Sequence, residues 1–223
     1  MKLVEYADAE MMAIDLANVL AGRLKNSLLV DDRVTFIVPG GETPGPMFDN
    51  LCAADLEWAR VDVILSDERW LPEVHVRSNS RMIKERLLTG RAAKAVFHSY
   101  YDEAMTPETV LPELEARLLP LLPAKMVLLG MGADMHTASL FPEGDNLELA
   151  LSESAPVVVP MRGTDIPEPR VTLSAKVLNE AMDKHLILTG TPKRNALEKA
   201  QGLPPETAPI AAILENCTVH WAP

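Results

Sequence analysis

Residues 34–44 read Val34-Thr35-Phe36-Ile37-Val38-Pro39-Gly40-Gly41-Glu42-Thr43-Pro44. The first five residues, β-branched except for one phenylalanine, predict a buried strand, and the two glycines after Pro39 predict a tight turn. A helix is expected from about Thr43, with Pro44 at its first position and apolar residues on its inner face. Those inner residues are Met47, Phe48 and Leu51. The stretch therefore predicts a strand, a glycine turn and a helix in succession.

The same succession recurs along the chain. Apolar runs predict strands at residues 61–65, 125–129, 157–159, 171–173 and 185–188. Helices are predicted at residues 9–25, after Ser78 or Asn79, at 111–122, from the 171–173 strand through Met182, and at 191–200. This alternation predicts an α/β fold: a single doubly wound, mostly parallel sheet, Rossmann-like, with helices on both faces. Because no low-complexity linker divides residues 1–223, we expect a single domain.

Composition narrows the class of partner. The 223 residues are 48% hydrophobic and 24% charged, which is typical of a globular protein, and the net charge is −11. A negative field repels nucleic acid and anionic membranes, so we expect neither as a partner. The first residues, Met-Lys-Leu-Val-Glu-Tyr-Ala-Asp, place acids before any apolar run and do not resemble a signal peptide. We therefore expect a cytoplasmic protein, with Cys52 and Cys217 as free thiols.

The loops after residues 38, 65, 129 and 188 should converge on one crevice, because ligands of parallel sheets bind outside the carboxyl ends of the strands. In the first loop, Gly40 and Gly41 allow close approach of the backbone. The N-terminus of the following helix would then favour an anion. Thr43 could cap that helix or donate its hydroxyl to a phosphate. The alternative is an ordinary strand-to-helix turn without a ligand.

Asp134 and His136 stand two residues apart in the glycine-flanked loop at residues 130–142. A carboxylate at that spacing can hold an imidazole in one tautomer, which suits a general base near neutral pH. The alternative is a structural histidine.

Three cations stand at or beside strand ends: Arg69 within Ser66-Asp67-Glu68-Arg69-Trp70, Arg170, and Lys193 within Thr189-Gly190-Thr191-Pro192-Lys193. Together they could supply the local positive charge that an anionic ligand needs in an acidic protein. Arg69 could instead form a structural ion pair with its acidic neighbours, and each cation alone could be a solvated surface charge. No metal-ligand spacing, Walker loop or nucleophile elbow is present, so we expect neither a metal nor a cofactor.

Over nearly its whole length, the chain resembles the 6-phosphogluconolactonase family. The residues that carry the resemblance are Gly40-Gly41-Glu42-Thr43-Pro44, residues 66–70 with His75, Ser78 and Asn79, residues 130–142, residues 170–173 and residues 189–193. The resemblance implies hydrolysis of 6-phosphogluconolactone to 6-phosphogluconate, in the oxidative pentose phosphate or Entner–Doudoroff route. It also implies a fold of the sugar-phosphate isomerase type, shared with glucosamine-6-phosphate deaminases.

In the mechanism that the resemblance implies, His136 activates water while Asp134 holds its imidazole. Gly40, Gly41, Thr43, Asp67, Arg69, Arg170 and Lys193 would bind the sugar phosphate. Two alternatives remain: a deaminase or isomerase with Asp67 as the base, and a non-catalytic sugar-phosphate sensor. We expect a monomer or weak homodimer.

Two residues depart from the family's usual pattern. Met135 replaces a glycine, which would cost on the order of 1 kcal/mol if the backbone there is left-handed. Its side chain could also project towards the crevice. Glu42 replaces a small hydroxyl residue, and we expect its carboxylate to point away from a bound phosphate.

Overall fold

A seven-stranded, all-parallel sheet forms the centre of the computed structural model, which describes residues 1–164 and 166–223. In spatial order its strands are β1 (Lys2–Glu5), β10 (Cys217–Ala222), β9 (Asp183–Thr189), β6 (Met126–Leu129), β2 (Val34–Val38), β3 (Val61–Leu65) and β5 (Val96–His98). This arrangement confirms the predicted parallel sheet.

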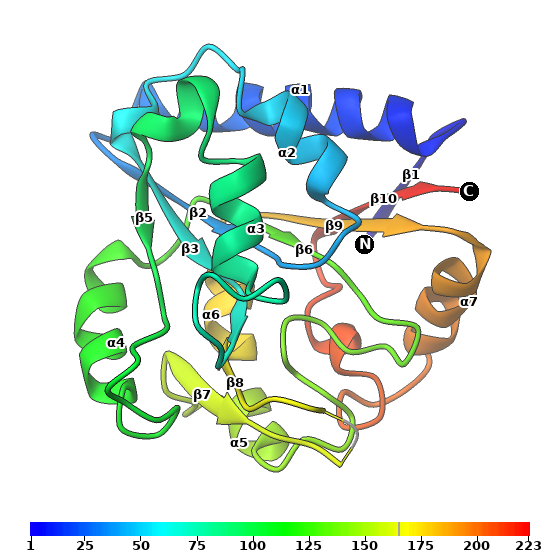
Figure 1. The fold of residues 1–223 in the computed structure, drawn as a ribbon. Coiled ribbons are helices and arrows are strands. Elements are labelled where there is room, and N and C mark those ends of the chain that lie inside the picture. The colour runs from blue at the N-terminus through cyan, green and yellow to red at the C-terminus, as the bar shows by residue number, and fades with distance from the viewer. Residues whose placement is uncertain (165) are drawn as a thin grey trace.

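Helices lie on both sides of this sheet (Figure 1). On one side are α1 (Ala9–Leu28) and α2 (Gly45–Leu51), and on the other are α4 (Leu111–Leu118) and α6 (Ala175–Glu180). The remaining helices are α3 (Asn79–Arg86), α5 (Leu147–Leu151) and α7 (Thr191–Ala200). Every residue of β2, β3 and β6 is buried, which explains why β6 is a continuous apolar run and why β2 and β3 do not alternate between apolar and polar residues.

A second, smaller sheet distinguishes the structure from the single sheet predicted. Its antiparallel strands are β4 (Asp67–Arg69), β8 (Arg170–Leu173) and β7 (Val158–Met161), in that order. The predicted strands at 157–159 and 171–173 belong here rather than to the parallel sheet. Because β4 follows β3 after a single residue, the chain passes directly from the large sheet into the small one. This passage places Asp67 and Arg69 at the carboxyl end of β3.

Several boundaries differ from those predicted. Helix α2 begins at Gly45 with Pro46 in its first turn, so Pro44 lies just before the helix. Helix α4 ends at Leu118 and continues as one 3₁₀ turn. The sequence did not indicate β1, β4, β5, β10 or α5, because these elements are only three to six residues long and lack a continuous apolar run. Among the described residues, no helix combines the length and apolar character needed to cross a membrane.

Candidate active site

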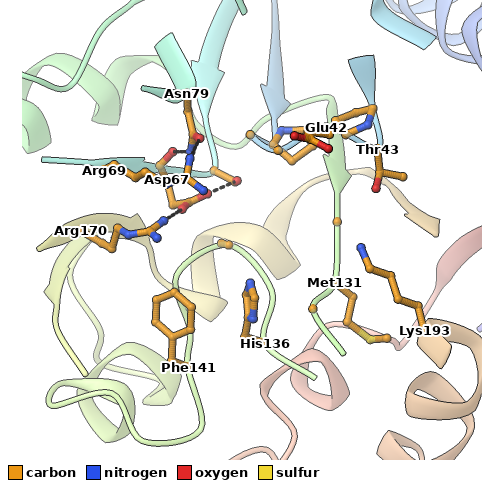
Figure 2. A pocket seen from close by; sticks show the side chains of 18 residues that line it. Glu42, Thr43, Asp67, Arg69, Asn79, Met131, His136, Phe141, Arg170 and Lys193 are labelled. Carbon is orange, nitrogen blue, oxygen red and sulfur yellow. Dashed lines mark hydrogen bonds and ion pairs between the residues drawn. The ribbon is translucent and has the colours of Figure 1, made fainter. Parts of the chain in front are cut away.

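An open pocket lies where the loops after β2, β3 and β6 meet residues of α7 and β8, as the sequence predicts (Figure 2). Its volume is about 260 Å³. It is lined by Pro39, Gly40, Gly41, Glu42, Thr43, Pro44, Ser66, Asp67, Arg69, Asn79, Gly130, Met131, Gly132, His136, Ala138, Phe141, Arg170 and Lys193. Of the predicted site residues, only Asp134 is absent from this lining, and its carboxylate contacts His136, which does line the pocket.

Asp134 and His136 form the pair that their spacing predicts. Nδ1 of His136 lies 2.6 Å from Oδ1 of Asp134, and the backbone N–H of His136 donates to the same oxygen at 3.3 Å. Burial opposes ionisation of this carboxyl, but the hydrogen bond and charge of His136 outweigh it and hold the pKa of Asp134 below its usual value. A carboxylate can only accept, so Nδ1 of His136 carries the proton of this hydrogen bond, and Nε2 is the acceptor when the imidazole is in its neutral form.

The loop that carries this pair has a strained backbone at Met135. Its φ is +70°, which is the left-handed conformation for which the sequence predicts a cost. Two backbone hydrogen bonds hold Met135 in this conformation. Its N–H donates to the carbonyl of Gly132 at 3.1 Å, and its carbonyl accepts from the N–H of Ile210 at 3.1 Å. The Met135 side chain packs against the hydrophobic core and does not line the pocket, so the expectation that it could project into the crevice is wrong.

Asp67 is buried in the pocket wall, and both of its oxygens have partners. Oδ1 accepts from the Ser66 hydroxyl at 3.0 Å, and Oδ2 accepts from the Ser139 hydroxyl at 2.6 Å. Nη1 of Arg170 lies 3.6 Å from Oδ2. The sequence does not point to Ser139 individually, although Ser139 stands in the loop at residues 130–142 that carries Asp134 and His136.

Glu68 is a structural residue, although it stands between two residues that line the pocket. It is buried, and its carboxylate accepts from the backbone N–H groups of Arg69, Asn79 and Ser80 at 2.7–2.8 Å. Burial raises the pKa of Glu68 and these hydrogen bonds oppose the rise. The carboxylate thus satisfies free N–H groups at the start of α3.

Arg170 is nearly buried, with 11% of its side chain exposed. Burial lowers the pKa of its guanidinium, and the charge of Asp67 acts in the opposite direction. Its Cζ lies 5.6 Å from the centre of the Phe141 ring, and the same ring lies 4.7 Å from that of His136. Phe141, another residue that the sequence did not single out, therefore stands between the pair and this cation.

The three predicted cations do not form one cluster. Arg69 and Arg170 lie on the Asp67 side of the pocket, and Lys193 reaches in from the opposite side, near Thr43 and Met131 (Figure 2). Lys193 is half-buried, and this burial lowers its pKa against the opposing charge of Asp134. The pocket therefore presents positive charge from two directions.

The loop after β2 combines two different glycines. Gly41 has a φ of +84°, which favours glycine, whereas Gly40 is packed against the side chain of Asn79. Thr43 does not cap α2, whose start has no side-chain cap, and its hydroxyl is on the Lys193 side of the pocket. Glu42 is exposed and is one of the residues that line the pocket, and the direction of its carboxylate relative to a bound phosphate stays a prediction.

Comparisons with known proteins show which family the chain resembles. Residues 7–221 match the family described as Glucosamine-6-phosphate isomerases/6-phosphogluconolactonase. A protein of Pseudomonas putida named 6-phosphogluconolactonase is 35% identical over 225 residues, covering 100% of this chain and 93% of its own. A Pseudomonas aeruginosa protein of the same name is 36% identical over 222 residues, covering 98% of this chain and 93% of its own.

Solved structures extend the likeness to the fold. A crystal structure of a 6-phosphogluconolactonase from Shewanella baltica superposes with a TM-score of 0.96 at 29% identity, covering 100% of this chain and 98% of that one. A monomeric glucosamine-6-phosphate deaminase superposes with a TM-score of 0.81 at 18% identity, covering 100% of this chain and 97% of that one, which shows a shared fold only. The chain belongs to the glucosamine-6-phosphate isomerase/6-phosphogluconolactonase family.

Proposed function

We propose that this protein hydrolyses 6-phospho-D-glucono-1,5-lactone to 6-phospho-D-gluconate, in the oxidative pentose phosphate or Entner–Doudoroff route. The observation that carries the proposal is the Asp134–His136 pair beside a pocket with cations on two sides. An imidazole held by a carboxylate is suited to activating water, and cations are suited to holding a phosphate. The relatives of this chain that are named 6-phosphogluconolactonases support the same reaction.

His136 acts as the general base in this proposal. With its Nδ1 proton directed to Asp134, Nε2 takes a proton from a water molecule as the water oxygen bonds to the lactone carbonyl carbon. The carbonyl π electrons move to oxygen and give a tetrahedral oxyanion. Asp134 stabilises the imidazolium that forms, because its carboxylate stays ionised beside it.

The second half of the reaction returns the proton. As the oxyanion collapses, the bond between the former carbonyl carbon and the ring oxygen breaks, and Nε2–H of His136 protonates that oxygen. The products are a hydroxyl group and a carboxylic acid, which then ionises. The net change is the addition of one water across the ester bond, and His136 ends in its starting state.

The phosphate of the substrate is proposed to lie against the loop after β2. Gly40, Gly41 and Thr43 offer backbone and hydroxyl donors, and Lys193 approaches the loop from the α7 side (Figure 2). Arg69 and Arg170 add positive charge from the Asp67 side of the pocket, and Asp67 adjoins the bound substrate. Holding the phosphate fixes the lactone relative to His136, which lowers the entropic cost of the reaction.

A deaminase or isomerase remains the second candidate, with Asp67 as its base. The Asp67 contacts argue against it, because Ser66 and Ser139 already donate to its two oxygens. Release of ammonia from glucosamine 6-phosphate would support this candidate. A sensor would bind sugar phosphate and turn over neither substrate.

The test is hydrolysis of freshly generated 6-phosphogluconolactone, corrected for spontaneous ring opening. The wild-type protein should accelerate it, and His136→Ala should lose most of this activity while still binding 6-phosphogluconate in calorimetry. Wild-type turnover by His136→Ala would remove His136 from the mechanism, and no acceleration by the wild type would overturn the proposed reaction.

We also propose that residues 1–223 form one domain that acts in the cytoplasm as a monomer or weak homodimer. The family match over residues 7–221 supports the single domain. Sedimentation across a range of protein concentrations would measure the oligomeric state.

A further inference from the structure

Asn79, the first residue of α3, connects separate parts of the pocket wall (Figure 2). Its side chain is buried. Nδ2 donates to the backbone carbonyl of Asp67 at 2.8 Å, and Oδ1 accepts from Nη1 of Arg69 at 2.6 Å. These partners determine the orientation of the amide, because a carbonyl only accepts and a guanidinium only donates. Residue 79 therefore needs a short planar side chain that carries both a donor and an acceptor, as the Asn79 amide does.

The same amide packs against the loop after β2. A Cβ atom built on Gly40 would lie 2.0 Å from Oδ1 of Asn79 and 2.1 Å from its Cγ, far inside the closest contacts that real side chains make. Glycine is therefore required at residue 40 by the Asn79 side chain, rather than by backbone dihedrals. The contact fixes the distance between this loop and the Arg69 side chain.

Arg69 is held through one end of its guanidinium. Nη1 donates both to Asn79 and, at 2.8 Å, to the carbonyl of Arg77. Within residues 1–164 and 166–223, Nε and Nη2 of Arg69 make no hydrogen bond, so these donors remain for a ligand in the pocket that Arg69 lines. Two acceptors on a single nitrogen restrict the plane of the group and hence the direction of its free N–H bonds.

We propose that Asn79 is a positioning residue for the anionic group of the substrate, acting through Arg69 and the Gly40 loop. Because Asn79 contacts both, it fixes the position of the free N–H donors of Arg69 relative to the backbone N–H donors of the Gly40 loop. The proposal rests on the proposed function only for the identity of the anion, a phosphate monoester. Asn79 itself is not assigned any contact with the reacting atoms.

Asn79→Ala removes both hydrogen bonds and the packing against Gly40. We expect KM for 6-phosphogluconolactone to rise about tenfold, the loss associated with one charge-assisted hydrogen bond, with a smaller change in kcat. KM for unphosphorylated gluconolactone should stay within about twofold, because it offers Arg69 no phosphate. Asn79→Asp should be worse than Asn79→Ala, because it places a carboxylate oxygen against the Asp67 carbonyl and adds negative charge beside the anion.

Ser78→Ala is the matched structural control. Ser78 caps α3 by accepting from the N–H of Arg81 at 3.2 Å, and its hydroxyl donates to Glu68 at 3.2 Å. It therefore belongs to the same helix start but is not a partner of Arg69 or Gly40 among the described residues. We expect Ser78→Ala to lower the melting temperature and to leave both KM values unchanged.

Two double variants test whether the effect passes through these neighbours. In an Arg69→Ala background, Asn79→Ala should add little to KM. Gly40→Ala should raise KM in the wild type but have a much smaller effect beside Asn79→Ala, because the atoms that its Cβ would meet are gone. Additive effects in both double variants, or equal losses with both lactones, would overturn the proposal and make Asn79 a residue of the fold alone.

Binding of inorganic phosphate, measured by calorimetry on the same variants, separates this proposal from the proposed reaction. If the wild type does not hydrolyse the lactone but binds phosphate more tightly than Asn79→Ala does, the reaction is wrong and the positioning role stands. If Asn79→Ala and the wild type bind phosphate equally, the positioning role is wrong, whatever the reaction.

Discussion

Gly132 and His136 are in a close contact that no other residue at position 132 could make. A Cβ atom on Gly132 would lie 2.3 Å from Nδ1 of His136 and 2.2 Å from Oδ1 of Asp134. The two side chains occupy the space that a methyl group would fill. The glycine thereby allows the carboxylate and the imidazole to meet at 2.6 Å beside the backbone of their own loop.

Gly132→Ala should therefore disrupt the pair without removing either member. We expect kcat for the lactone to fall at least about tenfold, because an imidazole displaced from its carboxylate loses orientation and stabilisation. KM should change less, since the phosphate residues are untouched. Steady-state kinetics measure this, and Gly130→Ala, where a Cβ would meet nothing within 4 Å, is the matched control. Equal effects of the two substitutions would contradict the steric argument.

Asp134→Asn should reduce kcat by roughly 10²-fold or more, the range associated with general-base catalysis. The neutral amide stabilises an imidazolium less, and its N–H₂ group could donate to Nδ1 and stabilise the wrong tautomer. Because the Asp134 side chain is 55% exposed, thermal stability should change little. A kcat close to wild type would show that His136 does not need its carboxylate.

Arg170→Ala and Lys193→Ala should each raise KM for 6-phosphogluconolactone by about tenfold or more. Charge-assisted hydrogen bonds to a phosphate dianion are the reason, since the protein as a whole carries a net charge of −11. Turnover of unphosphorylated gluconolactone should barely change. Equal losses with both substrates would show that these cations serve the fold or the reacting centre instead.

A chain of polar side chains joins α1 and β10 to β9, away from the pocket. The Tyr6 hydroxyl donates to Asp15 at 2.9 Å and lies 2.9 Å from Nδ1 of His220, whose Nε2 is 3.0 Å from Nδ1 of His185. With its own proton directed to Asp15, Tyr6 accepts from Nδ1–H of His220, and His220 accepts from His185. Burial, followed by the neighbouring His185, lowers the pKa of His220 to about 4.

This depressed pKa predicts a loss of stability on acidification. In the unfolded chain His220 binds a proton near its ordinary pKa of 6.5, whereas in the folded protein it does so only near 4. The free energy of unfolding should therefore fall as pH drops from about 6.5 towards 4, by up to about 3 kcal/mol. Urea denaturation at several pH values measures the slope.

His220→Gln should be less stable than the wild type at pH 7 and should show a flatter dependence over that interval. His75→Gln, in the loop before α3, is the control and should retain the wild-type slope. Parallel slopes for the wild type and His220→Gln would show that other groups cause the acid sensitivity.

The fold class could be predicted from the sequence because its signals are local. Eighteen residues hold the apolar run at β2, the glycines after it and the inner face of α2. Each of these two elements has the spacing of apolar residues that its burial requires. The order of strands was not predictable. Strands β1 and β10 come from opposite ends of the chain and pair side by side, and strand pairing depends on tertiary packing rather than on the sequence of either strand alone.

The sequence was enough to predict that the loops after β2, β3 and β6 meet at one pocket. Strands that run parallel must bring their carboxyl ends to one edge, so the loops carrying Gly40, Asp67 and His136 converge whatever the side chains do. How the pocket residues are held depends instead on tertiary contacts. Gly40 makes room for the Asn79 side chain, and Arg69 and Lys193 face the pocket from opposite sides. Both arrangements depend on contacts between distant segments of the chain, where close packing leaves space for one side chain and excludes another.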